Sequence, residues 1–232
     1  MGSQMSAEEV TADFLERFPA GTGALAHELW SNIGQLHLNW NNYRALFGTS
    51  PERIEVLNWA APSFFGLLDG ILRHNVFMGI ARLTDPPATS GHQNASLRTL
   101  LNALRSALTP SMFSDLDRNL ADLERYCKPI RDVRDRLIAH DDLATALDYH
   151  PDPLAGISRA FVEGSLLRLR EWFGTIEALY RGNPTSHEYV ISRGDGDYLM
   201  SVLQSAQEWA RERREQRRRK YRGTPTPNEP AA

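Results

Sequence analysis

Hydrophobic residues recur at steps of three or four along most of the chain, a pattern that predicts amphipathic helices with one buried face. The pattern is clearest over residues 7–17, 24–46, 114–146 and 157–180. The apolar stripe of the third segment passes through Leu116, Leu120, Leu123, Cys127 and Ile130. Within that segment Pro129 is expected to kink the helix. No apolar run approaches the roughly 20 residues of a membrane-spanning helix, so we expect no membrane partner.

Prolines and capping residues divide the middle of the chain into further elements. Residues 51–83 are apolar around much of the helical circumference, which predicts a central helix that is kinked or restarted at Pro62. A polar loop follows over residues 88–94, and Ser96 can then cap a short helix.

The C-terminal part of the chain carries weaker signals. Residues 188–192 favour a brief strand, and Asp197 can cap a final helix that runs into a basic tail. Together the elements predict an all-α fold, a bundle of about five or six helices with a basic C-terminal helical extension. The expected divisions are a cloning remnant with an N-terminal helix, the bundle, the extension and a disordered tail, at residues 1–23, 24–182, 183–222 and 223–232.

Composition places the protein among ordinary globular chains, because 41% of its 232 residues are hydrophobic and 24% are charged. The single cysteine, Cys127, excludes an intramolecular disulfide framework and a cysteine-rich zinc site. Because the sequence also shows no secretory signal, we expect a cytoplasmic protein. A Walker loop, a dinucleotide fingerprint, a serine elbow and a cluster of metal ligands are all missing, so we expect neither a cofactor nor a metal.

The net charge of −3 is unevenly distributed. Residues 208–232 hold eight basic and four acidic side chains, so the tail is basic and the rest of the chain is acidic. Such a run is commonly the solvated end of a helix, and it can also bind RNA through salt-sensitive phosphate contacts. The candidate RNA-binding residues are Arg211, Arg213, Arg214, Arg217, Arg218, Arg219 and Lys220.

The main chemical candidate lies near the end of the segment 114–146. One further step of four along its apolar stripe reaches Arg134, where a guanidinium is costly unless it is paired or faces another subunit. His140 follows six residues later, about 120° away around an ideal helix. Two interpretations fit this spacing. One is a paired core arginine with a histidine that favours the helix C-terminus, and the other is a groove shared by two copies of the helix.

The segment from Arg134 to His140, with the sequence RDRLIAH, resembles the signature of the HEPN superfamily (higher eukaryotes and prokaryotes nucleotide-binding). That signature is an arginine, usually followed by a polar residue, and then a histidine after a gap of four to six residues. Here Asp135 takes the polar position, and the gap is five residues.

Upstream motifs extend this resemblance to one branch of the superfamily, abortive infection U. They are FFGL at residues 64–67, IARLTDP at 80–86 and NASL at 94–97. The resemblance covers about residues 25–180 and stops before the basic tail. The sequence departs from the branch at Gly66 and in a rather long loop after Asp85.

The resemblance implies a role for each residue of the signature. Arg134 and His140 would be catalytic and Asp135 would position them, in a cleft at the two-fold axis of a homodimer. Many members of the superfamily are metal-independent endoribonucleases, and the residue types suit that chemistry. Histidine has a pKa near neutrality and can move a proton of the RNA 2′-hydroxyl, while arginine donates to the developing phosphorane. The resemblance therefore implies a phage-defence (abortive infection) or toxin effector that leaves a 2′,3′-cyclic phosphate and a 5′-hydroxyl.

Other interpretations stay open at this point. Several members of the superfamily bind nucleotides or partners without cutting RNA, so the protein could be a catalytically silent module, paired for example with a nucleotidyltransferase antitoxin. The pair His140-Asp141 suggests a metal-dependent HD phosphohydrolase, but the nearest upstream histidine, His92, is too remote to complete a ligand set. Arg82 and Asp85 either form a local ion pair or contact the Arg134 site.

Overall fold

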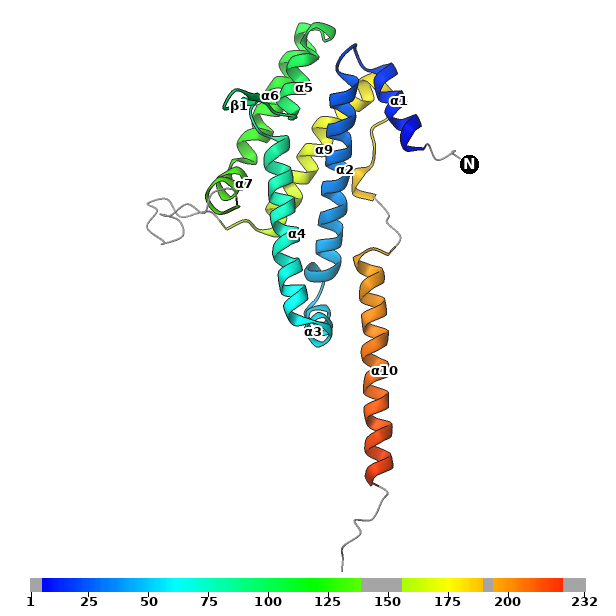
Figure 1. Cartoon of the computed structure of the whole chain (residues 1–232). Helices are drawn as coiled ribbons and strands as arrows, with labels where there is room; N and C mark the ends of the chain where they lie inside the picture. Colours follow the sequence, from blue (N-terminus) through cyan, green and yellow to red (C-terminus); the bar gives the residue numbers. More distant parts are fainter. Residues whose placement is uncertain (1–5, 139–155, 190–193, 223–232) are drawn as a thin grey trace, which may run out of the picture. The chain divides into compact units, whose positions relative to one another are not determined.

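The computed structural model describes residues 6–138, 156–189 and 194–222, and over these ranges the chain is almost entirely helical (Figure 1). Its α-helices are α1 (Ala7–Arg17), α2 (Gly23–Tyr43), α3 (Pro51–Ala60), α4 (Pro62–Leu83), α5 (Leu97–Ala103), α6 (Pro110–Tyr126), α7 (Lys128–Val133), α9 (Arg159–Arg181) and α10 (Gly196–Arg222). The shorter elements are the π-helical turns η1 (Arg44–Gly48) and η3 (Arg134–Ile138), the 3₁₀ turns η2 (Arg105–Ala107) and η4 (His187–Tyr189), and the antiparallel strands β1 (Ala88–Thr89) and β2 (His92–Gln93). The prediction of an all-α bundle is confirmed.

The chain divides into two units. The first contains residues 1–40 and 71–190, and the second contains residues 41–70 and 191–232. Helices α2 and α4 contribute residues to both units.

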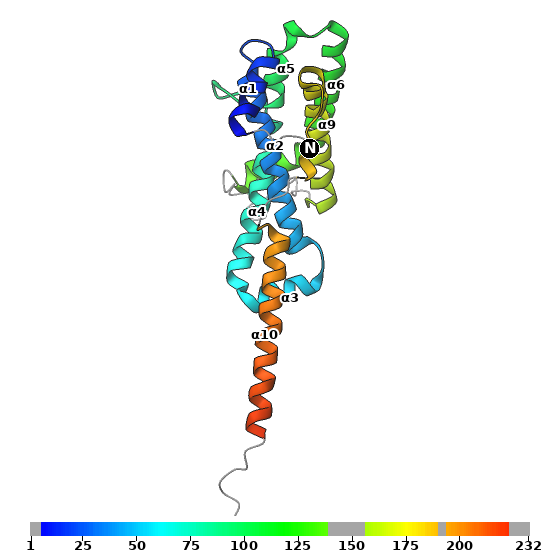
Figure 2. The same cartoon turned by 90° about the vertical axis from the view of Figure 1, so that its right-hand side faces the viewer.

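The first unit is a helical bundle in which α9 packs against α1 and α6, and α6 packs against α5 (Figures 1 and 2). Its core is apolar and dense, as expected for helices that each bury one face. The largest fully buried side chains of this unit are Phe14, Leu29, Ile33, Ile80, Leu97, Leu100, Leu101, Leu104, Leu120, Ile130 and Phe173.

Local capping explains where several helices of the first unit begin and end. At the start of α1, the backbone N–H of Glu9 donates to Ser6 Oγ and the backbone N–H of Ser6 donates to Glu9 Oε2, which forms a capping box. Ser96 caps α5 as predicted, by accepting from the backbone N–H of Thr99. The helix α9 ends at Arg181, and the next residue, Gly182, has a φ of 88°, in the left-handed region that glycine adopts without strain.

The segment 114–146 is more broken than its apolar pattern suggests. The five stripe residues from Leu116 to Ile130 are all buried, as predicted. However, α6 ends at Tyr126, and Pro129 lies in the first turn of a new helix, α7, where its missing N–H has no partner to lose. The expected kink is therefore a restart, and it places Arg134 at the junction of α7 and η3.

Helix α4 corrects another expectation. Pro62 restarts the helix as predicted, because α3 ends at Ala60 and α4 begins at Pro62. The expected central position is wrong for the first half of α4, since Phe64, Leu67 and Ile71 are 59%, 64% and 51% exposed. The apolar residues around this half of α4 therefore form an exposed surface and not part of a buried core.

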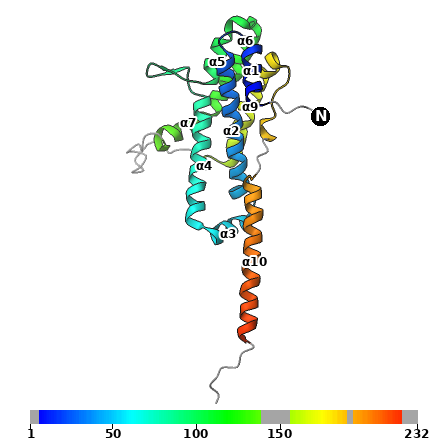
Figure 3. The same cartoon turned by 45° about the vertical axis from the view of Figure 1, so that its right-hand side comes forward.

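In the second unit, α10 packs against α3 and η1 (Figure 3). Arg53 of α3 pairs with Asp197 of α10, with 2.6 Å between Nη1 and Oδ1. The cap of α10 is Asp195, whose Oδ1 accepts from the backbone N–H of Tyr198, so the prediction of Asp197 as the cap is wrong. The brief strand expected over 188–192 is also wrong at residues 188–189, which belong to the 3₁₀ turn η4, while residues 190–192 lie outside the described ranges.

Candidate functional site

Arg134 is the first residue of the π turn η3 and the C-cap of α7. Its backbone N–H is bonded to the carbonyls of Ile130 and Arg131, so the helical backbone fixes its position. The preceding residue, Val133, is buried and continues the apolar stripe. Arg134 therefore lies beside the core and not in it, with a side chain that is 15% exposed.

Two carboxylates hold the guanidinium of Arg134. Its Nη1 donates to both carboxylate oxygens of Asp85, at 2.8 and 2.6 Å, and its Nε donates to Asp135 Oδ1 at 2.7 Å. Asp85 is as buried as Arg134, whereas Asp135 is 56% exposed. Burial lowers the pKa of Arg134, but the hydrogen bonds and negative charges of the two aspartates outweigh burial and raise it above its ordinary value. The arginine is thus a permanently charged group in a fixed orientation.

A second arginine forms hydrogen bonds at the same end of α4. Arg131 Nη1 donates to the hydroxyl and the backbone carbonyl of Thr84, at 3.1 and 3.3 Å. Thr84 is buried, and its hydroxyl donates in turn to the carbonyl of Ile80. Arg131 and Arg134 therefore bind the two consecutive residues that follow α4, Thr84 and Asp85.

The hydrogen bonds leave part of the arginine available. A guanidinium has five N–H donors, and Arg134 uses those of Nε and Nη1, so its Nη2 has no hydrogen bond to any residue that the structure describes. A group of this kind can donate to an anionic oxygen while Asp85 keeps its plane fixed. The same two aspartates also neutralise the charge of the arginine locally.

His140 lies outside the described residues. The structure brings Asp135 into contact with Arg134, and it adds Asp85 to the site. The interpretation of Arg82 and Asp85 as a local ion pair is wrong, because the carboxylate of Asp85 bonds to Arg134. The catalytic roles of Arg134, His140 and Asp135 stay predictions.

The family HEPN_AbiU2, described as AbiU2, matches residues 21–198. The chain belongs to this family. No curated protein and no solved structure matches this chain. The HEPN_AbiU2 match includes the sequence from Arg134 to His140 and ends shortly after the start of α10.

The basic residues of α10 lie beyond the part that matches HEPN_AbiU2. All seven candidates from Arg211 to Lys220 lie on this helix and are exposed. Arg213 also stacks over Trp209, with its guanidinium carbon 4.9 Å from the ring centroid, and the tryptophan is 59% exposed. These residues belong to the second unit, whereas Arg134 belongs to the first, and their binding of RNA stays a prediction.

No three His, Cys, Asp or Glu side chains among the described residues are grouped so that they could hold a metal ion. Of the histidines considered for an HD-type site, His92 lies exposed on β2, and His140 is outside the described ranges. No helix within the described ranges is both long and apolar enough to cross a membrane.

Sequence reasoning missed a buried polar cluster around Glu177 of α9. Its carboxylate accepts from Arg181 Nη1 at 2.7 Å and from the hydroxyl and backbone N–H of Thr185 at 2.8 and 3.0 Å. Beside it, His37 and His187 are buried with Nε2 atoms that lack a hydrogen-bond partner within the described structure. Burial is the main cause that lowers the pKa of each histidine to about 4, so both are neutral at pH 7. Position 37 lies four residues after the buried Ile33, a spacing that signals burial, but the partner 150 residues away is invisible in the sequence.

A polar stripe on α2 was also missed. Glu28, Asn32, Gln35 and Asn39 follow one another at steps of four, three and four, the same helical spacing as the apolar stripe beside them. All four line a cleft against α4. The regular spacing of these four polar side chains is visible in the sequence and could have indicated a functional polar surface.

Proposed function

We propose that this HEPN_AbiU2 protein is a metal-independent endoribonuclease, a phage-defence or toxin effector that acts on RNA in the cytoplasm. The observation that carries the proposal is the partly buried guanidinium of Arg134, which Asp85 orients while Nη2 stays available to an anionic oxygen. The family match supports it, because the sequence from Arg134 to His140 lies inside the matched residues.

The chemistry needs a base and a fixed cation. His140 would take the proton of the 2′-hydroxyl, so that O2′ attacks the adjacent phosphorus while the bond from phosphorus to O5′ breaks. Arg134 would donate to the non-bridging oxygens, where negative charge develops, and a proton would return to the departing O5′. The products are a 2′,3′-cyclic phosphate and a 5′-hydroxyl, and no metal is required for their formation.

A homodimer is part of this proposal, with the two Arg134 and His140 sets facing one cleft. The exposed apolar side chains Phe64, Leu67 and Ile71 on α4 support association, because contiguous exposed apolar surface is typical of interfaces. Light scattering at micromolar concentration should report twice the chain mass. A strictly monomeric protein would count against a site shared by two subunits.

The test of the nuclease proposal is His140→Ala, assayed on bulk tRNA with detection of cyclic phosphate ends. We expect loss of cleavage with the fold retained, and the matched control is His92→Ala, which removes an exposed histidine from β2. A folded His140→Ala protein that cuts as fast as wild type would end the assignment.

A second candidate function is a catalytically silent module that binds a nucleotide or a partner such as a nucleotidyltransferase antitoxin. One observation favours it: Arg134 already has two carboxylate partners within its own chain, the arrangement of a structural arginine. Under this alternative the wild type neither cuts RNA nor harms cells, and Arg134→Ala acts only on stability. Cleavage by the wild type separates the two functions.

A further inference from the structure

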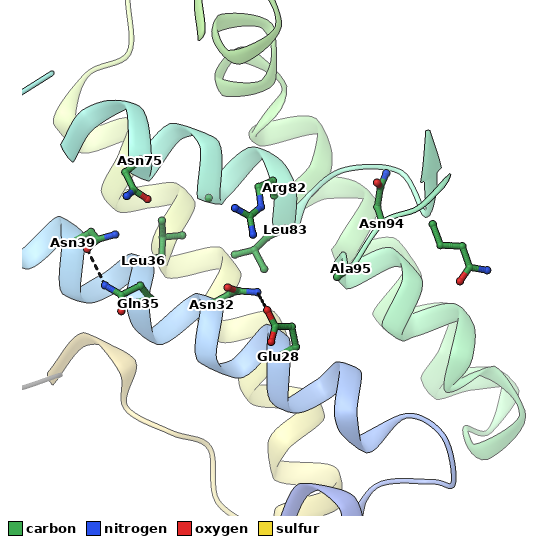
Figure 4. Close-up of a pocket in the computed structure, with 12 residues that line it drawn as sticks. Glu28, Asn32, Gln35, Leu36, Asn39, Asn75, Arg82, Leu83, Asn94 and Ala95 are labelled. Carbon is green, nitrogen blue, oxygen red and sulfur yellow. Dashed lines mark hydrogen bonds between the residues drawn. The ribbon is translucent and has the colours of Figure 1, made fainter. Parts of the chain in front are cut away.

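A polar cleft lies between α2 and α4, closed at one end by the segment around β2 (Figure 4). Its volume is about 390 Å³, within the range of roughly 300–1,000 Å³ typical of small-molecule sites. Six of its lining side chains are primary amides, whereas small-molecule sites are lined mainly by apolar side chains. They are Asn32, Gln35 and Asn39 of α2, Asn75 of α4, and Gln93 and Asn94 beside β2. We name this site the amide cleft.

Most of the amides are only partly committed to the protein, whereas Asn94 Nδ2 donates to the carbonyl of Pro86 at 2.8 Å and to Thr89 Oγ1 at 2.9 Å. Gln35 Nε2 donates to Asn39 Oδ1 at 2.9 Å, and Asn32 Nδ2 donates to Glu28 Oε1 at 3.0 Å, pairs that Figure 4 shows along α2. Such pairs orient the amide planes and leave further donors and acceptors open. Asn75 and Gln93 make no side-chain hydrogen bond to the residues that the structure describes. The cleft therefore offers several planar donor–acceptor groups that await a ligand.

The floor of the cleft is apolar. It is formed by Leu36 and Leu83, each 3% exposed, and by Gly79, which lacks a side chain that could fill the space. A Cβ atom at Gly79 would lie only 2.7 Å from Leu36 Cδ1, so a larger residue there would displace the leucine side chain that forms the floor. The combination of an apolar floor and planar amides suits a flat ligand with alternating donors and acceptors on its edge.

One cation stands at the edge of the cleft. The guanidinium of Arg82 lies between α4 and α2 in Figure 4, is exposed, and has no hydrogen bond or ion pair with any described side chain. Arg82 is three residues before Asp85, the residue that holds Arg134. The end of α4 thus carries Arg82 at the cleft, and three residues later Asp85 binds Arg134.

We propose that the amide cleft binds the base of an unpaired nucleotide in single-stranded RNA, with Arg82 contacting the adjoining phosphate, and so selects where Arg134 acts. Asparagine and glutamine pair with base edges through one donor and one acceptor each, and unpaired bases can be turned out of a strand into such a site. A duplex does not fit into about 390 Å³, and a stable protein interface buries roughly 800 Å² on each partner, far more than one small cleft offers. Only the selection of the position where Arg134 acts rests on the proposed function; the binding of a base by the amide cleft does not depend on it.

The test uses binding of RNA that cannot be cut. We would measure the affinity of the full-length protein for 2′-O-methyl homopolymers of A, C, G and U, which lack the attacking hydroxyl. The wild type should rank the four bases. Asn75→Leu should weaken the preferred strand on the order of tenfold and leave the weakest strand unchanged. Arg82→Gln should weaken all four strands to a similar extent, as expected for a phosphate contact.

Asn119→Leu is the matched control, because Asn119 is an exposed asparagine on another helix, α6. It should keep the affinities and the ranking of the wild type. Gln93→Leu tests the same cleft from a different element and stands in for Asn75→Leu if circular dichroism shows that the latter is unfolded. Affinities and a ranking that survive both Asn75→Leu and Gln93→Leu would overturn the proposal.

The remaining arms separate this inference from the nuclease proposal. A protein that ranks strands through the cleft but leaves unmodified RNA intact would support the base site and refute the nuclease. A protein that cuts RNA without any base ranking would do the reverse. Binding of free nucleoside monophosphates without binding of any strand would overturn the assignment of the cleft to RNA.

Discussion

Asp85 and Arg134 are 49 positions apart in the sequence, and Arg134 Nη1 donates to both carboxylate oxygens of Asp85. The pair joins the end of α4 to the junction of α7 and η3. Both side chains are 15% exposed, so solvent screens the pair less than it screens a surface ion pair. The orientation of the candidate catalytic arginine is therefore set by a residue far from the signature motif.

Replacing Asp85 should reveal both roles of this pair. Asp85→Asn removes the negative charge from a partly buried guanidinium, and we expect the free energy of unfolding to fall by about 1–3 kcal/mol and RNA cleavage to fall with it. Urea denaturation and a tRNA cleavage assay are the measurements. The control is Asp115→Asn, which breaks an exposed pair with Arg118 and should cost less than about 1 kcal/mol. Equal stability of the two variants would show that the Asp85 pair is no stronger than a surface pair.

The signature residues should act as one unit. If Arg134 and His140 serve the same transition state, Arg134→Ala and His140→Ala should each abolish cleavage and cellular toxicity. The double variant should then be little worse than either single one. Rates that multiply across the double-mutant cycle would indicate two independent contributions. Arg134→Ala should also lower stability, because it leaves Asp85 without its partner.

Stability should decrease in mild acid because of His37 and His187. The ring centroids are 6.3 Å apart, and burial lowers the pKa of each to about 4, whereas an unfolded histidine titrates near 6.5. Arg170, Arg181 and Glu188 act on the pair in addition. The unfolded chain binds more protons below pH 6.5, so this contribution is complete above that pH and is lost as the pH falls toward 4. The slope should approach about 1.4 kcal/mol per pH unit for each histidine.

Urea unfolding at pH 7.5 and pH 5 measures this effect. His187→Gln should flatten the pH dependence between those values, and the control His92→Gln changes an exposed histidine of β2 and should leave it unaltered. An unfolding free energy that is equal at the two pH values would show that the buried histidines do not control acid stability.

The basic end of α10 should contribute salt-sensitive RNA affinity. Deleting residues 208–232 removes the seven candidate cations and keeps Asp197, which pairs with Arg53, and the buried Met200. We expect weaker RNA binding and a shallower slope of the logarithm of the binding constant against the logarithm of the salt concentration. The far-ultraviolet circular dichroism, scaled to the helical residues that remain, should not change. The same salt slope before and after truncation would identify the tail as the solvated end of a helix.

Chelation should leave cleavage intact. The described residues supply no cluster that could hold a metal ion, and the proposed reaction uses a histidine and an arginine. RNA cleavage should therefore proceed at the same rate in excess EDTA. Activity that disappears with EDTA and returns with a divalent ion would transfer support to a metal-dependent phosphohydrolase.

Local signals in the sequence predicted most of the helices. The segment 7–17 forms a helix with those bounds because Ser6 and Glu9 cap its start, and Pro51 and Pro62 mark the first residues of two helices. These features depend on residues only a few positions apart. The cap of the last helix was predicted two residues too late: Asp195 caps α10, and Asp197 pairs instead with Arg53 of a distant segment.

The candidate site was less predictable for the same reason. The apolar stripe directed attention to Arg134, but the two interpretations of Asp85 could be separated only by tertiary contacts. The exposed face of α4 shows the opposite problem. Its apolar residues predict burial, and nothing in a single sequence distinguishes a core from a surface that another molecule covers.

The π turn η3 begins at Arg134 and contains five residues. A π turn closes its hydrogen bonds from residue i to i+5, one position further than an α turn, so it accommodates one additional residue. A chain that gains or loses a residue here can exchange one kind of turn for the other, while α7 and Asp85 keep Arg134 in place. We therefore expect the turn to tolerate one residue more or less on the C-terminal side of Arg134, which would accommodate gaps of different length between the arginine and the histidine of the superfamily signature.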